Sequence, residues 1–273
     1  MLRDMFVTQS NKKLFVTDLD GTLLKIGNEL SKGVSEENRL ALSLFVNKGN
    51  YVALASARPV NYIDEMEKQL GFKPFFIGDN GSSIAYNDTI IKHYLDNQIY
   101  YEIAKMIDDL NINASLIYHS YDNTYYRDRD HYPNNYLNPH HNPSIFDRHQ
   151  IINNVEKLKC KSLSLLIDPK NMKKYRDLLK DVFKDKASVF SSDIDFININ
   201  PLNCTKGNGV LKLVEELNIN INNVAAIGDS DNDISMLDIC TNSFCMDHSD
   251  DEVKKHAAFI VSSVKDAVEL FDK

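Results

Sequence analysis

Residues 14–22 read LFVTDLDGT, a short apolar run that ends in two aspartates, Asp18 and Asp20, followed by a glycine. An apolar run of this length predicts a buried strand. In an open α/β sheet, ligands bind at the carboxyl ends of the strands, which is where both acids fall. Gly21 lets the chain leave the extended conformation at this point, so that both carboxylates can face one bound group.

The same pattern of strand and helix recurs in the first and last thirds of the chain. Apolar runs lie at residues 51–55, 75–77 and 224–227, and helical patterns lie at residues 35–48 and 59–70. A glycine follows each of these two helical patterns, as is typical where a helix ends. Alternating strands and helices predict an α/β fold, here a Rossmann-like core with a parallel sheet and helices on both faces.

The middle third differs and predicts an inserted α+β cap domain. Strand-like segments at residues 115–126, 162–167 and 187–200 accompany helix-like segments at residues 97–110 and 170–184. We therefore expect a discontinuous core of residues 1–83 and 201–273, with the cap at residues 84–200, because insertion at surface loops is physically cheap. Residues 127–149 are polar and punctuated by proline, which predicts a long surface loop.

A second acidic cluster, GDSDND at residues 228–233, follows the apolar run 224–227. Carboxylates that converge from two strand ends would repel a phosphate, so a hard dication such as Mg²⁺ is expected between them. An ordinary Asp-Gly turn with solvated acids remains the alternative for the first cluster taken alone. A calcium-binding EF-hand loop is excluded for the second, because Ile234 and Cys240 stand where such a loop needs Gly and Glu.

Such a pair of acids can carry out phosphoryl transfer. A carboxylate such as Asp18 can attack phosphorus and form an aspartyl-phosphate, and a second carboxylate such as Asp20 can protonate the leaving oxygen and later accept a proton from water. Ser56 and Ala57 follow the run 51–55, where a hydroxyl and free N–H groups could form an anion site. Lys206 opens a helical pattern, where a nearby negative group would offset the helix dipole. The alternatives are a simple helix cap for Ser56 and a surface position for Lys206.

Composition bounds the remaining possibilities. The chain has 273 residues, 43% of them hydrophobic, and a formal net charge of -8. This charge argues against a nucleic-acid partner, and no run approaches the ~20 apolar residues that span a membrane. The N-terminus lacks the apolar core of a signal peptide, and the spacing of the four cysteines suits reduced thiols, so a cytoplasmic location is expected.

Four motifs follow one another along the chain: residues 18–22, residues 56–57, Lys206 and residues 228–233. In this order they resemble the motifs of the haloacid dehalogenase superfamily of phosphatases, in its Cof-like branch with a large cap (type IIB). The first motif, DxDGT, and the fourth, GDxxND, are matched fully. The resemblance implies Asp18 as nucleophile, Asp20 as general acid/base, and Mg²⁺ held by Asp18, the backbone carbonyl of Asp20 and Asp229. It also implies a supporting acid near the metal at Asp233, and phosphate contacts from Ser56, Ala57, Lys206 and Asn232. Asn80 and Gly81 resemble the Asn-Gly before the cap and are interpreted as a turn.

The function implied is a phosphomonoester hydrolase for small phosphorylated metabolites such as sugar phosphates. A phosphomutase-type phosphotransferase and a catalytically silent sensor are the alternatives. Neither the physiological substrate nor the oligomeric state can be read from the sequence. Residues 118–141, rich in Tyr, Asn and His, are the candidate substrate contact within the cap, with an ordinary solvated loop as the alternative. The spacing of His119, His131, His140 and His141 is not that of a known transition-metal site.

Overall fold

The computed structural model describes residues 11–24, 33–121, 124–126, 158–191 and 195–273. The chain divides into two compact units, the core unit (residues 1–91 and 206–273) and the inserted unit (residues 92–205). Each has its own hydrophobic core. The inserted unit is contiguous in sequence, and the core unit is therefore assembled from both ends of the chain.

The core unit is built on a sheet with the strand order β13-β12-β11-β1-β2-β3-β4-β5. Its central strand, β1 (Leu14–Thr17), is buried along its whole length and runs parallel to its two neighbours. The other parallel strands are β2 (Tyr51–Ala55), β3 (Phe75–Gly78), β11 (Val224–Gly228), β12 (Asn242–Met246) and β13 (Phe259–Val261). The predicted α/β fold class is confirmed.

The sheet departs from the prediction at one edge, where it is not parallel. The strand β4 (Ser83–Tyr86) pairs antiparallel with β3, with Ala85 opposite Phe76, and β5 (Thr89–Lys92) follows it at the edge of the sheet. The predicted domain boundary at residue 84 falls inside β4 and would separate β4 and β5 from the sheet to which they belong. Because pairing with β3 anchors β4 in the sheet, the units divide after Ile91, and the chain returns to the core unit at Lys206 instead of at residue 201.

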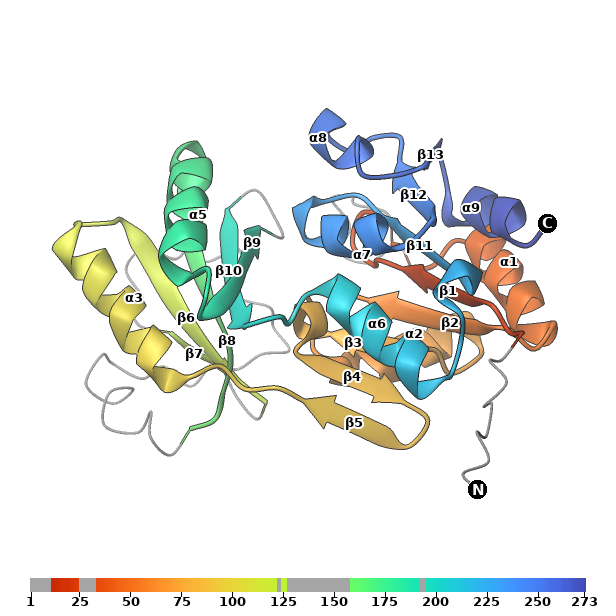
Figure 1. Ribbon diagram of the computed structural model, residues 1–273, viewed down its shortest axis with the longest axis horizontal. Coiled ribbons are helices and arrows are strands. Elements are labelled where there is room, and N and C mark those ends of the chain that lie inside the picture. Colours follow the sequence, from red (N-terminus) through yellow and green to blue (C-terminus); the bar gives the residue numbers. More distant parts are fainter. Residues whose placement is uncertain (1–10, 25–32, 122–123, 127–157, 192–194) are drawn as a thin grey trace, which may run out of the picture. The chain divides into compact units, whose positions relative to one another are not determined.

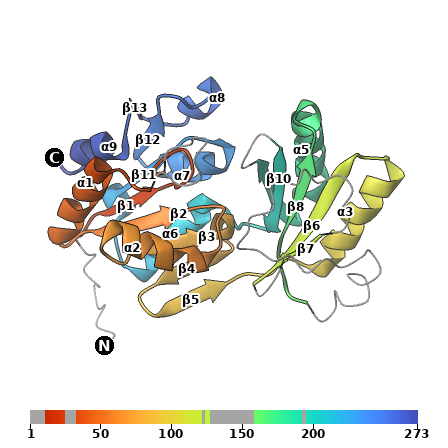
Figure 2. The ribbon, with the colours of Figure 1, turned by 180° about the vertical axis from the view of Figure 1, so that it is seen from behind.

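Helices cover both faces of this sheet (Figures 1 and 2). On β1, Phe15 contributes to a core shared with α1 (Glu36–Asn47), α2 (Ile63–Leu70) and α9 (Val264–Phe271). Leu14 and Val16 point the other way and pack in a core with α6 (Lys206–Glu216), α7 (Ile234–Ile239) and α8 (Asp251–Lys254). The alternation of side chains along a strand thus supplies an apolar surface to each helical layer.

Local signals set the helix ends. The Ser35 side chain accepts a hydrogen bond from the Asn38 N–H at the start of α1, and Gly71, with φ 78°, ends α2. Pro59 begins the short 3₁₀ helix η1 (Val60–Tyr62), so α2 starts four residues after the predicted position. Other 3₁₀ turns within the described part of the chain are η2 (Asp79–Gly81), η5 (Ile221–Asn223) and η6 (Asp231–Asp233).

The inserted unit is an antiparallel sheet with helices packed on one face. Its strands are β6 (Ala114–Ser120), β7 (Thr124–Tyr126), β8 (Cys160–Ile167), β9 (Ala187–Ser191) and β10 (Phe196–Pro201), in the order β7-β6-β8-β10-β9. The helices α3 (Asn97–Asp109) and α5 (Pro169–Phe183) share its core. Each of the strand-like segments 115–126 and 187–200 comprises two strands, and the predicted loop 127–149 lies outside the described residues.

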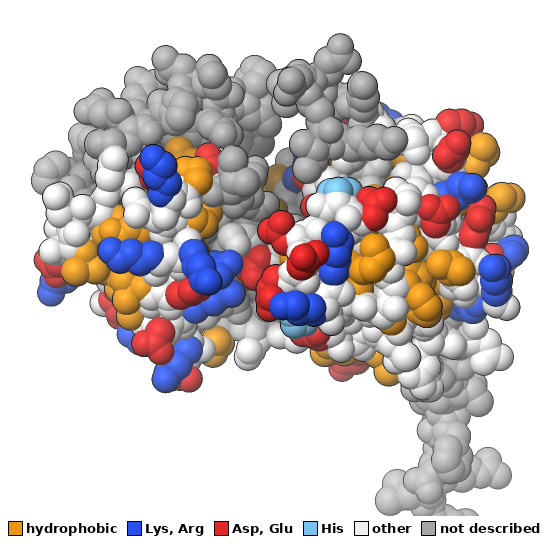
Figure 3. Space-filling view, turned by 90° about the horizontal axis from the view of Figure 1, so that it is seen from above, with side chains coloured by type: hydrophobic (Ala, Val, Ile, Leu, Met, Phe, Trp, Pro, Cys, Tyr) orange, Lys and Arg blue, Asp and Glu red, His pale blue; other side chains and the backbone are white. Residues whose placement is uncertain are grey.

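Other sequence-based expectations can be compared with the described residues. The four cysteines, Cys160, Cys204, Cys240 and Cys245, are buried and free. Within the described ranges, no helix has both the length and the apolar character needed to cross a membrane. On the face seen in Figure 3, Lys and Arg side chains are interspersed with Asp and Glu side chains.

Candidate active site

The two acidic clusters lie side by side because their strands are neighbours. Thr17 is paired with Ile227 at the ends of β1 and β11, and the Asp18 N–H donates to the Ile227 carbonyl over 3.0 Å. Asp229 follows β11 directly. One carboxylate oxygen from each of Asp18, Asp229 and Asp233 lies within 4.8 Å of the others. The sheet therefore gathers three acids at the carboxyl ends of its central strands, where α/β folds bind ligands.

Lys206, the first residue of α6, is buried among these acids. Its Nζ lies 2.7 Å from Asp18 Oδ1 and 2.5 Å from Asp233 Oδ1, and its side chain is 1% exposed. Burial alone would lower the pKa of Lys206, but the two carboxylates outweigh burial and raise that pKa. The alternative of a solvated surface lysine is thus excluded, and a permanent ammonium stands at the helix N-terminus with two acids to offset it.

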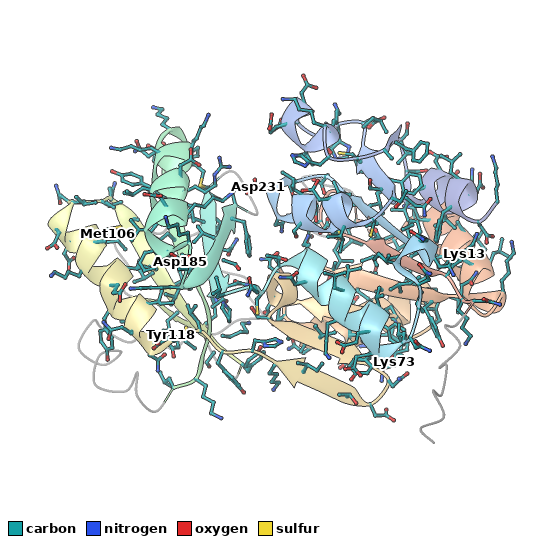
Figure 4. The ribbon with its side chains drawn as sticks, in the orientation of Figure 1. Lys13, Lys73, Met106, Tyr118, Asp185 and Asp231 are labelled. Atoms are coloured by element: carbon teal, nitrogen blue, oxygen red, sulfur yellow. The ribbon has the colours of Figure 1, made fainter. Side chains whose placement is uncertain are left out.

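Asp233 is held on both of its carboxylate oxygens. Oδ1 accepts from Lys206, and Oδ2 accepts from the backbone N–H groups of Asp229 (2.9 Å) and Ser230 (3.0 Å). These bonds fold the turn η6, which Asp231 begins (Figure 4). With its oxygens already engaged, Asp233 serves to fix Lys206 and the backbone at Asp229.

Asp18 retains an oxygen that is free for a ligand. Its Oδ2 is buried and has no hydrogen-bond partner among the described residues. Burial raises the pKa of Asp18 well above its usual value; Lys206 opposes that rise, while Asp233 and Asp229 add to it. When all three carboxylates are ionised, they leave two negative charges against the one ammonium, and a divalent cation would balance these charges and favour the ionised forms. The donor set and the orphaned oxygen therefore fit Mg²⁺, which prefers a few carboxylates together with water and phosphate.

Asp229 is aimed at the loop that follows Asp18. The Thr22 hydroxyl donates to Asp229 Oδ1 over 2.7 Å, and burial, followed by the charge of Asp233, raises the pKa of Asp229. Gly21 has φ 96°, and a Cβ there would lie 2.5 Å from Asp229 Oδ2. The glycine of the first motif thus permits both the turn and the close approach of Asp229.

Asp20 and Arg58 form a bidentate ion pair at the more exposed side of the site. Arg58 Nε lies 2.8 Å from Asp20 Oδ2 and Nη2 lies 2.6 Å from Oδ1. The Arg58 guanidinium also stacks on the Tyr62 ring, 4.2 Å from its centroid. The Asp20 side chain is half exposed, whereas Asp18 and Asp233 are buried.

The loop after β2 supplies a hydroxyl beside this pair. Ser56 is buried, and its Oγ accepts from the Arg58 N–H at 3.1 Å, while Ala57 is exposed between them. Asn232 is buried in η6, and its Nδ2 donates to Asn80 Oδ1 over 2.9 Å. The sequence motifs gave no catalytic or binding role to Arg58 or Thr22, and they predicted only a turn at Asn80.

The predicted substrate stretch 118–141 is only partly described. Tyr118 lies in the hydrophobic core of the inserted unit, where its hydroxyl donates to Asn97 Oδ1 over 2.9 Å (Figure 4). It is therefore a packing residue. His119 points to the opposite face, with its Nε2 3.0 Å from Ser164 Oγ. His131, His140 and His141 lie outside the described residues.

Comparisons with known proteins agree with this geometry. A model of the haloacid dehalogenase-like hydrolases matches residues 15–269. The 5-amino-6-(5-phospho-D-ribitylamino)uracil phosphatase YcsE of Bacillus subtilis is 28% identical, over 94% of this chain and 92% of that protein. SMU.1108c of Streptococcus mutans UA159 shares the fold with a TM-score of 0.79 and 20% identity, over 96% of this chain and 98% of that one. The subclass IIB sugar phosphatase BT4131 does so with a TM-score of 0.77 and 17% identity, over 96% and 99%.

Proposed function

The chain belongs to the haloacid dehalogenase-like hydrolases and is a phosphatase, and we propose that it hydrolyses small phosphorylated metabolites with Mg²⁺ through a phosphorylated Asp18. The observation that carries this proposal is the group of Asp18, Asp229, Asp233 and Lys206 at the ends of β1 and β11. A group of three acids and one buried lysine suits an anion only when a cation accompanies it.

Asp18 and Asp229 would hold the Mg²⁺, together with the backbone carbonyl of Asp20. When bound, the ion supplies positive charge that offsets the acids and polarises the phosphoryl oxygens. Asp233 lies within the same cluster, but its oxygens are engaged by N–H groups. We therefore assign it to holding Lys206 and the turn that carries Asp229.

In the first half of the reaction, Asp18 attacks phosphorus as the bond to the leaving oxygen breaks, and Asp20 donates a proton to that oxygen. In the second half, water attacks the phosphorus of the aspartyl-phosphate while Asp20 takes a proton from the water, and Asp18 is regenerated as inorganic phosphate forms. Lys206 and the groups of Ser56, Ala57 and Asn232 would bind the phosphoryl oxygens, because hydrogen-bond donors fixed before the reaction lower its barrier.

The proposal is tested by phosphate release from p-nitrophenyl phosphate. We expect turnover with Mg²⁺, loss of turnover in EDTA and recovery on adding Mg²⁺ in excess. Hydroxylamine converts an acyl phosphate into a hydroxamate, so mass spectrometry of the wild-type protein during turnover should find this modification at Asp18. Full activity in a metal-stripped sample would contradict the role of Mg²⁺, and turnover that never modifies Asp18 would contradict the covalent intermediate.

The substrate is sought among phosphate esters of polyhydroxylated molecules. The Bacillus subtilis relative is named for an ester carried on a ribityl chain, and the related fold of BT4131 belongs to a sugar phosphatase. A panel should therefore pair phosphorylated sugars and sugar alcohols with phosphorylated amino acids and nucleotides. Preference for the first group, measured as kcat/KM, is the expected result. A bisphosphate requirement would instead identify a phosphomutase.

A further inference from the structure

The turn after β3 has three consecutive residues with positive φ. Asp79, Asn80 and Gly81 all have positive φ, at 54°, 52° and 97°. Residues other than glycine rarely adopt this left-handed conformation, although Asn and Asp tolerate it best. Strain of this kind persists only where surrounding contacts maintain it, and it concentrates at functional sites.

The hydrogen bonds that maintain this turn connect it to the loop after β2, which carries Ser56 and Arg58. The Asp79 N–H donates to the Arg58 carbonyl and the Asn80 N–H donates to the Ser56 carbonyl, both over 2.9 Å. The Asp79 carboxylate accepts from the Ser83 hydroxyl over 2.6 Å, which closes the turn from its other side. The backbone of the turn is therefore joined to the loop that carries Ser56 and Arg58.

The side chain of Asn80 extends to the second acidic cluster. Its Oδ1 accepts from Asn232 Nδ2 over 2.9 Å, and the Ser230 hydroxyl donates to Asn232 Oδ1 over 3.0 Å. Asn80 and Asn232 are 3% and 7% exposed. Both the oxygen and the nitrogen of the Asn232 amide are thus held by hydrogen bonds. Because Nδ2 of Asn232 carries two N–H groups, one of them remains available after the bond to Asn80.

We propose that Asn80 is a positioning residue for the phosphoryl group. It holds the amide of Asn232 so that an N–H, and not the carbonyl oxygen, is available to the anion. Without this bond, rotation of the amide could direct a partial negative charge at the phosphate. This inference rests on the proposed function, because it assigns the phosphoryl group to the space beside Asn232.

The test compares Asn80→Gly, Asn232→Ala and the double variant, with inorganic phosphate and Mg²⁺ as the probe in calorimetry. Glycine keeps the left-handed turn but removes the acceptor. Each single variant should bind phosphate on the order of 10-fold more weakly, as expected for a lost hydrogen bond to a charged group. The double variant should bind about as weakly as Asn232→Ala alone, because Asn80 acts through Asn232. If the loss of phosphate affinity in the double variant equalled the product of the two single losses, the proposal would be overturned.

Asn87 offers a matched control because it also has a positive φ, 49°, and lies in the exposed turn between β4 and β5. Asn87→Gly makes the same chemical change in the same backbone conformation, and it should leave phosphate binding unchanged. An equal loss in both variants would trace the effect to the backbone and overturn the role of Asn80.

A second measurement does not depend on the folding of Asn80→Gly. In ¹⁵N-labelled wild type, the side-chain amide signal of Asn232, identified by its absence in Asn232→Ala, should shift when phosphate is added with Mg²⁺. An unmoved signal at saturating phosphate would overturn the proposal. Hydrolysis of p-nitrophenyl phosphate is followed in parallel. Phosphate binding without turnover in wild type contradicts the proposed function, whereas full binding by Asn80→Gly in an active enzyme contradicts the role of Asn80.

Discussion

Arg58 engages both carboxylate oxygens of Asp20, at 2.8 and 2.6 Å, and is itself stacked on Tyr62. Burial would lower the pKa of Arg58, but its hydrogen bonds and charge interaction with Asp20 raise it. A fork that binds both oxygens fixes the plane of the carboxylate as well as its position. In the proposed reaction, one of these bonds must open while Asp20 carries the proton that it donates, and it can form again once Asp20 is a carboxylate, so Arg58 sets the orientation of the transferring group.

We expect Arg58→Ala to lower kcat for p-nitrophenyl phosphate by about 10-fold or more, because small errors in the placement of a catalytic group are costly. Arg58→Lys should lie in between, since it keeps the charge but loses the two-point contact. Arg39→Ala is the matched control, because Arg39 forms a similar pair with Glu36 on α1. Equal kcat values for Arg58→Ala and the control would remove Arg58 from this role.

Asp20→Asn should lower kcat by ~10²–10⁴-fold, the usual contribution of general acid–base catalysis. Asp18→Asn should abolish turnover, because an amide is a poor nucleophile, and both variants should remain folded by circular dichroism. Asp64→Asn, an exposed acid on α2, should retain full activity. A rate within threefold of wild type for Asp20→Asn would exclude its assigned part.

Stability should depend on pH through Asp18. Its folded-state pKa is raised, so its contribution to the free energy of unfolding is present below the ordinary pKa and is lost as pH rises through the raised one. Mg²⁺ favours the ionised form, and the rise in melting temperature that Mg²⁺ produces should therefore grow with pH across this window. Scanning fluorimetry with Mg²⁺ and with EDTA at several pH values measures it. A pH-independent increment in wild type, equal to that of Asp18→Asn, would contradict this linkage.

A comparison of Gly21→Ala with Gly49→Ala should separate the cost of the left-handed backbone from the displacement of Asp229. Gly21 and Gly49 have similar φ values, 96° and 87°, but a Cβ at Gly49 meets nothing within 4 Å. Both alanine variants should lose about 1 kcal/mol of stability or somewhat more through the left-handed backbone. Only Gly21→Ala should also lose Mg²⁺-dependent stabilisation and activity, because its methyl group displaces Asp229. Equal activity in the two variants would show that this close approach is unimportant.

The cysteines should be unreactive in the native protein. All four are buried and free, and burial raises the pKa of Cys240 to about 12. Because the thiolate is the reactive form, Ellman's reagent should label few thiols before unfolding and four in denaturant. Rapid labelling of Cys240 under native conditions would indicate that α7 opens readily.

The core and most of the candidate site could be predicted because short segments determine them. The acids follow apolar strands directly, and Thr17 and Ile227 are paired neighbours, so two local patterns were enough to place Asp18 beside Asp229. Lys206 could be placed at a helix N-terminus, but its burial depends on Asp18 and Asp233, which are distant in sequence. Local sequence patterns suggest that Lys206 lies near an acid, but they specify neither the acid nor the distance between the two side chains.

Other features depend on contacts that no local pattern reports. The ion pair of Asp20 with Arg58 joins residues whose side chains meet only after β1 and β2 align. The strand β4, which lies between β3 and the edge strand β5, begins where the predicted core ends, because a strand of four residues gives little periodic signal. Tyr118 begins the stretch 118–141 that was the candidate substrate contact, but alternation along β6 directs its side chain into the core between sheet and helix.

The order of the central strands has a consequence for how this protein is made. Synthesis completes residues 92–205 before β11 exists, so the inserted unit has its whole sequence while β1 still lacks one neighbour. Domains tend to fold as units during translation, and a strand left at an edge can pair with other chains. Once residues 92–205 have left the ribosome, the nascent chain would thus carry a complete inserted unit while the core sheet is still open at β1 and prone to aggregate.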